Sequence, residues 1–230
     1  MSTRSIIRVF LNGEYRVCQY VQSDGYPEWR GVEVLKFMRK LLQDGREQEF
    51  RDKISAARTM LQSTTQHPRV RTPSVTFTGA RYTSVRGALL EKCHEARFLP
   101  ISEENPYGTR MRSWREAIEH LLAAGELNDK EAAYLAVAGR DSGIGALEWL
   151  MAYDTPMTFY MPDDLVKLPR GGGDSGSDMI WGDYIIDLDA RAVGCGYHQK
   201  LYVTPFDLLV NETDEQIKKS MEHLEKEAWK

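Results

Sequence analysis

The sequence predicts an α+β fold, in which an antiparallel sheet built from an N-terminal hairpin and C-terminal strands carries helices on one face. Three observations lead to this prediction. Strand signals are concentrated at the two ends of the chain, helix signals lie between them, and the composition, 42% hydrophobic and 28% charged, is typical of globular proteins. Pairing the two ends predicts one domain over residues 1–230, with a helical insert at 109–153.

The N-terminal hairpin has the clearest local signal. Ser5–Leu11 and Glu14–Val21 are rich in β-branched and aromatic residues, and the Asn12-Gly13 dipeptide between them favours a tight hairpin turn. Apolar residues then recur at helical spacing over 32–43 and over 47–61. The sequence therefore predicts a hairpin followed by two helices.

Capping signals define the helices farther along the chain. Ser113-Trp-Arg-Glu116 is a capping box, Asn128 with Asp129 begins a second helix, and 144–153 is a third helical segment. Another capping box, Thr213-Asp-Glu-Gln216, opens a C-terminal helix. Short strands are predicted at 157–161, 184–188, 192–196 and 200–206.

The chain as a whole carries no targeting or cross-linking signal. Cys18, Cys93 and Cys195 are too scattered for a disulfide framework or a metal clip. There is no run of 18 or more apolar residues and no apolar segment behind the first eight residues, which predicts neither a membrane span nor a signal peptide. We therefore expect a cytoplasmic protein without a metal or another cofactor.

The charge is distributed unevenly along the chain. Residues 1–99 contain 17 Lys and Arg against 10 Asp and Glu, a net charge of +7, whereas residues 100–230 contain 13 against 24, a net charge of −11. The sum is the net charge of −4. This asymmetry predicts either a charged face for a partner or two halves whose charges meet within the molecule.

The segment between the hairpin and the first helix is the strongest candidate for function. Gly25 and Pro27 favour a tight turn, and rigid loops of this kind often carry binding residues. Alternatively, the segment is a corner whose aromatic side chains close the end of the core. The candidate ligand- or partner-binding residues in it are Asp24, Tyr26, Glu28, Trp29 and Arg30.

A basic segment and one histidine complete the set of candidates. Between residues 62 and 86 the chain has four arginines and no acidic residue. Arginine matches phosphate oxygens well, so this segment could bind phosphate or RNA; alternatively, acidic residues of the same fold balance its charge. His198 lies in a predicted turn beside Tyr197. The further candidate binding residues are thus Arg69, Arg71, Arg81, Arg86 and His198.

Two other patterns have a chemical and a structural interpretation. Cys93 and His94 are adjacent in sequence, but a nucleophile and its base need a spatial geometry that adjacency does not provide. Asp183, Asp187 and Asp189 would lie on one face of a strand and could hold a divalent cation, but the chain has no glycine-shaped calcium loop there, which favours exposed strand carboxylates over a cation site. Neither pattern predicts a catalytic or metal site.

The run Tyr20-Val-Gln-Ser-Asp-Gly-Tyr-Pro-Glu28, together with the later segment Gly182-Asp-Tyr-Ile-Ile-Asp-Leu-Asp189, resembles small uncharacterised proteins of bacteriophages and mobile elements. Those proteins share an Asp-Gly-Tyr-Pro turn after an N-terminal hairpin. The resemblance covers the two ends of the chain and leaves the helical cluster unmatched. It implies a phage origin and a protein that acts on host machinery, but it implies no catalytic residue.

Two functional hypotheses follow. The first is a non-enzymatic binding protein of phage type, an inhibitor of a host defence nuclease or nucleoprotein complex that acts through a charged surface in the host cytoplasm. The second is a small enzyme or a sequestering protein for a nucleotide or another phosphorylated ligand. The lack of a recognised catalytic constellation favours the first. Its partner would be a host protein or ribonucleoprotein, with a homodimer and, less favoured, direct nucleic-acid binding as alternatives.

Overall fold

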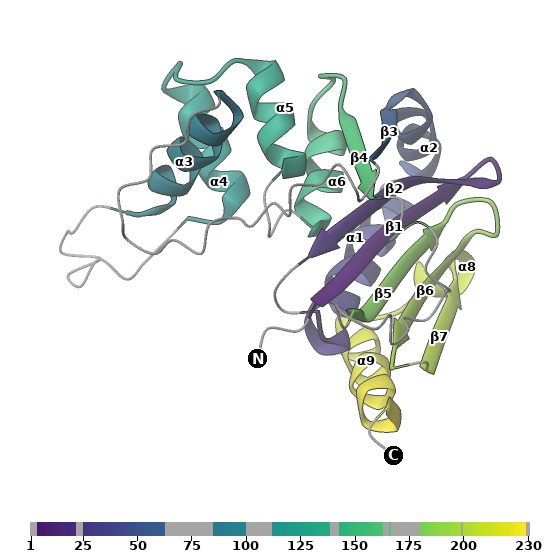
Figure 1. The fold of residues 1–230 in the computed structure, drawn as a ribbon. Helices are drawn as coiled ribbons and strands as arrows, with labels where there is room; N and C mark the ends of the chain where they lie inside the picture. Colours follow the sequence, from purple (N-terminus) through teal and green to yellow (C-terminus); the bar gives the residue numbers. More distant parts are fainter. Residues whose placement is uncertain are drawn as a thin grey trace.

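The structure, a computed structural model, has a five-stranded sheet with helices on one face and a group of helices beside it (Figure 1). It describes residues 4–21, 25–62, 85–99, 112–138, 143–162, 166, 180–198 and 200–228. The predicted α+β class is confirmed, because the N-terminal hairpin and the C-terminal strands share one sheet.

The sheet has the strand order β2-β1-β5-β6-β7. Its hairpin turn has the left-handed backbone that Asn-Gly favours, with φ of 57° at Asn12 and 81° at Gly13. The strands are β1 (Arg4–Leu11), β2 (Glu14–Val21), β5 (Ile180–Asp187), β6 (Ala192–Tyr197) and β7 (Lys200–Pro205).

The predicted antiparallel arrangement holds for β1–β2, β5–β6 and β6–β7, but the central pair β1–β5 is parallel. In this pair Ile6 lies opposite Asp183. The pairs of neighbouring strands are joined by short turns, which impose an antiparallel direction. The connection from β2 to β5 contains most of the helices, so no turn fixes the direction of that pair.

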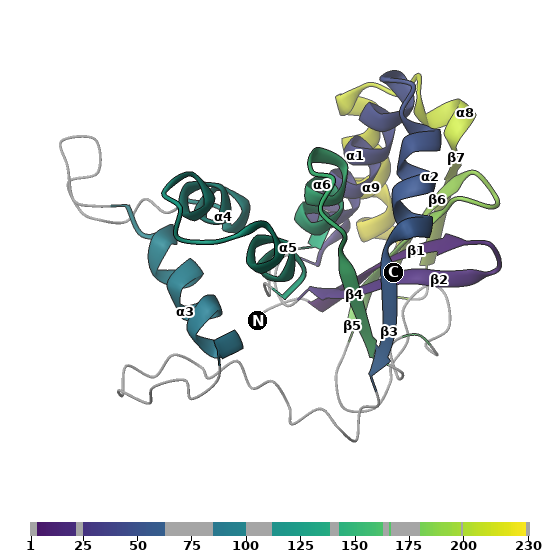
Figure 2. The same ribbon diagram turned by 90° about the horizontal axis from the view of Figure 1, so that it is seen from above.

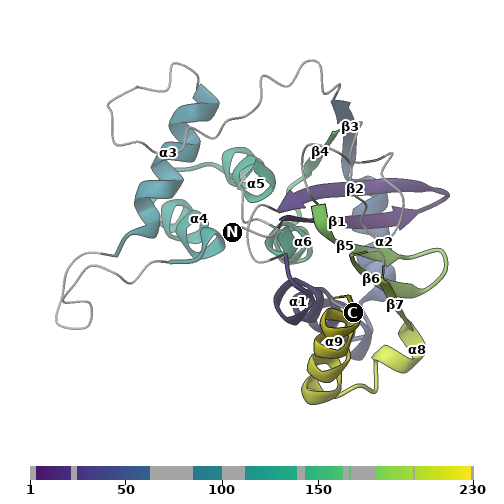
Figure 3. The ribbon, with the colours of Figure 1, turned by 60° about the horizontal axis from the view of Figure 1, so that its bottom comes forward.

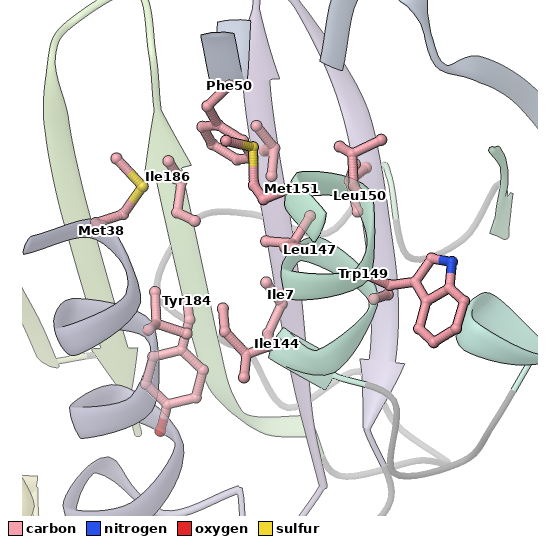
Figure 4. Packing of buried hydrophobic residues seen from close by; sticks show 14 of the residues in the cluster. Ile7, Met38, Phe50, Ile144, Leu147, Trp149, Leu150, Met151, Tyr184 and Ile186 are labelled. Carbon is pink, nitrogen blue, oxygen red and sulfur yellow. The ribbon is translucent and has the colours of Figure 1, made fainter. Parts of the chain in front are cut away.

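One face of the sheet is covered by helices that bury a continuous apolar core (Figures 1 and 2). Figure 4 shows this core where α6 lies against the strands, with Ile144, Leu147 and Met151 close to Ile7 and Ile186. The helical elements on this side are a π-helical turn η1 (Pro27–Gly31), α1 (Val32–Gln43), α2 (Glu47–Ala56), α6 (Gly143–Ala152), α8 (Phe206–Leu209) and α9 (Asp214–Ala228).

A second group of helices lies to one side of the sheet. It consists of α3 (Val85–Arg97), α4 (Trp114–Ala123) and α5 (Asp129–Ala138). The predicted capping box at the start of α4 is present, with Ser113 and Glu116 each bonded to the other's backbone. Figures 2 and 3 show α6 between this group and α1. The buried apolar cluster continues through α6 into α4 and α5.

The second predicted helix, over 47–61, is too long. In the structure α2 ends at Ala56, and a strand β3 (Arg58–Gln62) pairs in parallel with β4 (Thr158–Pro162). Helical apolar spacing over this segment suggested a longer helix, but Leu61 is exposed rather than buried on an inner face. The carbonyl of Met157 accepts the Arg58 amide and helps to fix the start of the strand pair.

Candidate functional site

The turn between β2 and α1 has an unusual backbone. After Tyr26, which is extended, Pro27 begins the π-helical turn η1, and the Arg30 amide donates to the Tyr26 carbonyl at 2.9 Å. π-Helical turns are rare and occur frequently at functional sites. The segment that the sequence marked as the strongest candidate therefore has a backbone that supports this interpretation.

Close packing holds the entrance of this turn in place. The buried Tyr184 hydroxyl donates to the Gly25 carbonyl at 2.9 Å, and a Cβ at Gly182 would lie 2.5 Å from the same carbonyl oxygen. At the other end of η1, a Cβ at Gly31 would lie 2.6 Å from Sδ of Met221 in α9. The turn thus sits directly on β5 and α9, which leaves it little freedom to move.

The packed turn presents two side chains to solvent. Pro27, Arg30 and Gly31 are buried, whereas Glu28 is exposed and the Trp29 side chain is 65% exposed. A large aromatic residue on a rigid element loses little conformational entropy when a partner covers it. Trp29 is therefore well placed to contact another molecule.

Beside η1, side chains from three elements form a cluster of aromatic rings and carboxyl groups. We call it the tyrosine–glutamate cluster, and it comprises Tyr26, Glu28, Tyr197, His198 and Glu225. The Tyr197 ring lies 6.2 Å from the Tyr26 ring and 4.6 Å from the His198 ring, measured between centroids. Three sequence-predicted residues, Tyr26, Glu28 and His198, are thereby brought together.

Burial and neighbouring charge raise the pKa of two groups of this cluster. Burial raises the pKa of the Glu225 carboxyl, and the negative charge of Glu28 and a hydrogen bond to that side chain raise it further. Burial likewise raises the pKa of the Tyr197 hydroxyl, with smaller contributions from Glu225 and Tyr26. Two neighbouring carboxyl groups of this kind can share a proton or donate a hydrogen bond to a partner.

The structure separates Arg30 from this cluster. Its guanidinium is buried, pairs with Glu33 at 2.5 Å, and lies close to Gly143 at the start of α6. There it lines a cavity of about 180 Å³ together with Trp114 and Trp149. Trp29 and Arg30 are adjacent in sequence but lie in different environments. Trp29 is exposed to solvent, whereas Arg30 is buried beside the cavity.

Part of the predicted site falls outside the described residues. Asp24, Arg69, Arg71 and Arg81 lie outside the described residues. Arg86 belongs to α3, but its side-chain surroundings also lie outside the description. The hypothesis that the basic segment binds phosphate or RNA stays a prediction.

Opposite charges from the two halves of the chain meet within the molecule. Asp214 of α9, for example, pairs with Lys36 at 2.5 Å and also with Arg39, and these two cations lower the pKa of its carboxyl. Such pairs neutralise part of the charge that would otherwise be available for binding a partner. Among the described residues, the pairs that join a cation of residues 1–99 to an anion of residues 100–230 are Arg8–Asp183, Lys36–Asp214, Arg39–Asp214, Lys53–Asp154 and Lys92–Glu126.

The two alternative chemical patterns do not form sites. Burial raises the pKa of the Cys93 thiol to about 12, so its reactive thiolate is scarce at neutral pH. Asp183 is buried against Arg8, while Asp189 accepts the amides of Asn12 and Gly13 at 2.9 Å each. Within the described ranges no group of three or more His, Cys, Asp or Glu residues could hold a metal ion.

Sequence reasoning missed Glu225, Trp114 and Trp149. Glu225 is one of many charged residues in an amphipathic helix, so nothing in the sequence distinguished it. The two tryptophans have the spacing of core residues, and only the packing of α4 against α6 places them on one cavity. Tyr197, next to His198, was the only additional residue of the cluster that the sequence could have indicated.

A larger and more open pocket, of about 480 Å³, lies between α2 and α8. Its charged side chains are already paired with one another, since Arg191 contacts Glu47 at 2.9 Å and Asp207 at 3.1 Å. Arg51, which also lines it, donates to the Leu188 carbonyl. This pocket therefore gives no specific indication of a ligand.

No protein-family profile matches the chain, and no curated protein or solved structure is significantly similar to it. The resemblance to phage proteins consequently stays an expectation from the sequence. In the part of the chain that the structure describes, no helix has the length and apolar character needed to cross a membrane.

Proposed function

We propose that this chain is a non-enzymatic binding protein whose contact surface is centred on η1. The observation that carries the proposal is the 65% exposure of Trp29 on a π-helical turn that contacts both β5 and α9. Tryptophan is the residue type most enriched among the side chains that dominate protein interfaces. A rigid turn also reduces the entropy that is lost on binding.

The charge around Trp29 favours a protein partner over nucleic acid. Glu28, its neighbour in η1, is exposed, and α9 beside the turn is rich in acidic residues. A nucleic-acid surface would need an excess of Lys and Arg to neutralise phosphates. The partner that fits is a protein with an apolar pocket for the indole and polar or basic groups around that pocket.

The sequence resemblance to phage proteins supports a more specific proposal. It makes the partner a host protein or ribonucleoprotein in the host cytoplasm, and the binding an inhibition of a defence nuclease or nucleoprotein complex. The intramolecular pairs of Asp214 and Asp154 reduce the acidic charge available to mimic phosphate. The contact surface proposed here is therefore the aromatic turn rather than the acidic half as a whole.

The test is affinity purification of the tagged protein from bacterial lysate, with mass spectrometry of the retained proteins. We expect a stoichiometric partner for the wild-type chain and a loss of at least about tenfold for Trp29→Ala, the effect of removing a central interface residue. The matched control is Leu208→Ala, because Leu208 in α8 is 62% exposed and is remote in sequence from η1. Equal recovery from both variants would contradict the proposal.

A second candidate function rests on the tyrosine–glutamate cluster. The approach of Tyr26 and His198 to Tyr197, with Glu28 raising the pKa of the neighbouring Glu225 carboxyl, supports a small enzyme or a sequestering protein for a nucleotide or another phosphorylated ligand. Mass spectrometry of small molecules in the same purification tests this alternative. A retained nucleotide without a protein partner would replace the first proposal, and His198→Ala should then abolish its retention.

A further inference from the structure

The strand β7 forms one end of the five-stranded sheet (Figure 1). Its inner edge pairs with β6, and in the described part of the chain no strand pairs with its outer edge. The other end of the sheet is covered, because the Thr59 hydroxyl of β3 donates to the Arg16 carbonyl of β2 at 3.0 Å. Lysine and proline, which block sheet edges in natural proteins, stand only at the two ends of β7, at Lys200 and Pro205.

The hydrogen-bond pattern between β6 and β7 follows from one bond. In an antiparallel pair, opposite residues alternate between those that exchange backbone hydrogen bonds and those that do not. The Phe206 amide donates to the Arg191 carbonyl at 2.8 Å. These two residues continue the strand register by one position, since the last pair of the register is Ala192 and Pro205. Every second pair, counted back from Phe206, is therefore a bonded pair.

The alternation gives the outer edge of β7 a regular set of backbone groups. Tyr202 and Thr204 belong to the bonded pairs and use their backbone groups toward β6. The N–H and C=O groups of Leu201 and Val203 point instead to the open edge, as does the carbonyl of Pro205. The edge thus offers two donors and three acceptors in the alternating order that an extended chain requires.

The residues with outward backbone groups also carry exposed apolar side chains. Leu201 is 52% exposed and Val203 is 53% exposed. On the same face of the sheet, β6 places Gly196 opposite Leu201 and Gly194 opposite Val203, so no side chain of β6 covers them from that position. An added strand would bring its own side chains beside these two, and β-branched residues suit such cross-strand positions.

The size and place of the edge favour a segment of another protein over a second copy of this chain. β7 has six residues and is about 20 Å long, whereas a stable dimer needs about 800 Å² on each partner, more than one such edge provides. The edge begins beside Tyr197 and His198, and the Tyr197 ring lies 6.2 Å from that of Tyr26. A partner held at η1 can therefore reach it. The exposed Glu28 near that end favours a basic residue beside the segment.

From these features we propose that β7 receives an extended segment of the protein partner, which adds a sixth strand to the sheet. Backbone hydrogen bonds to Leu201 and Val203 hold the segment, and its β-branched residues lie beside those two side chains. A basic residue follows at the end near Glu28. This inference rests on the proposed function, because the segment belongs to the protein that contacts Trp29, but it uses different groups of the chain.

The first experiment measures amide hydrogen exchange of the full chain by NMR. In the free protein the Leu201 and Val203 amides should exchange at least about tenfold faster than those of Tyr202 and Thr204, which are bonded to β6. The probe is the peptide acetyl-Lys-Val-Thr-Val-Thr-Val-Lys-amide. It should bind with a Kd below about 1 mM and slow exchange at Leu201 and Val203. The same peptide with N-methyl groups on its three central amides is the control and should not bind.

Two variants at one position separate the backbone contact from the side-chain contact. Val203→Pro removes an outward N–H without breaking a bond to β6, as Pro205 shows two residues later, and the peptide affinity should fall about tenfold or more. Val203→Thr keeps both the N–H and the branched shape, so it should bind the peptide within about threefold of wild type. Circular dichroism melting verifies that both variants are folded.

Three results would overturn the proposal. They are no binding of the peptide at about 5 mM, equal binding of its N-methylated form, and wild-type affinity in a folded Val203→Pro variant. A chain that is dimeric in analytical ultracentrifugation and becomes monomeric with Val203→Pro would assign the edge to a second copy instead. Partner capture by Trp29 is measured separately from peptide binding, so the failure of one proposal is distinguished from the failure of the other.

Discussion

Glu225 illustrates at the scale of single residues how the candidate site differs from the surrounding surface. Its carboxyl lies close to that of Glu28, and burial together with this neighbour raises its pKa. An acid with a raised pKa in the folded state stabilises the fold below the pKa of the unfolded chain, near pH 4.5. That contribution is lost as the pH rises through the folded-state pKa.

We therefore expect Glu225→Gln to raise the free energy of unfolding at pH 7 and to change it little near pH 4, because the amide carries no charge at either pH. Urea unfolding at both pH values measures the difference. Glu215→Gln, an exposed change in the same helix, is the control and should not raise stability at pH 7. A destabilised Glu225→Gln variant at pH 7 would show that the carboxyl pair is not strained.

At this scale the sequence predicted the candidate site in part. Tyr26, Glu28 and Trp29 were found because a glycine and a proline mark a turn whatever the rest of the fold does. His198 was found as a turn residue, and its φ of 46° agrees with that prediction. Glu225 could not be found, because only the docking of α9 on η1 distinguishes it from the other acidic residues of the helix.

At the scale of elements, the position of η1 depends on Gly182 and Gly31, because a Cβ at either position would collide with a neighbouring segment. Gly182 is the tighter position: an added Cβ would lie 2.5 Å from the Gly25 carbonyl oxygen and 2.9 Å from the Tyr184 ring. Backbone cannot move aside as a flexible side chain can. The strand β5 and the turn η1 therefore constrain each other directly.

Gly182→Ala should lower the free energy of unfolding by about 1–3 kcal/mol, the usual cost of overpacking a filled site. Gly194→Ala is the matched control in the neighbouring strand, since its Cβ would meet Leu201 and Ile185 only at 3.7 and 3.9 Å. That variant should be neutral or slightly more stable, because alanine costs less backbone entropy than glycine. Chemical denaturation of both variants tests the difference, and equal stabilities would contradict it.

The elements that the sequence predicted well are those with local signals. The hairpin needs only Asn12 and Gly13 at its turn, and α4 needs only the reciprocal bonds of Ser113 and Glu116. The strand β3 was missed because its pairing partner, β4, lies about 100 residues later in the chain. The parallel direction of β1 and β5 escaped prediction for the same reason.

At the scale of the whole molecule, the prediction of a single domain can be tested with the three thiols. Cys18 lies in β2, Cys195 in β6, and Cys93 in α3 of the helical group, and all three are buried. Because the apolar core runs without interruption from the sheet into α4 and α5, the helical group and the sheet should unfold together.

We expect a thiol reagent to label the three cysteines over the same range of denaturant concentration and to label none of them quickly in buffer. Mass spectrometry of the labelled peptides resolves the three positions. Labelling of Cys93 well before Cys195 would show that the helical group opens separately, and the prediction of one domain would then be wrong.

The parallel contact between β1 and β5 has a consequence for how the chain is made. Asn12 and Asp189, which bond beside the hairpin turn, are 177 positions apart. A ribosome adding about 5–20 residues per second needs roughly 9–35 s to cover that interval, and an isolated hairpin is marginal in water. During translation the inner edge of β1 stays uncovered for this time. Chaperone supply and synthesis rate should therefore limit the yield of folded protein more than the stability of the finished fold does.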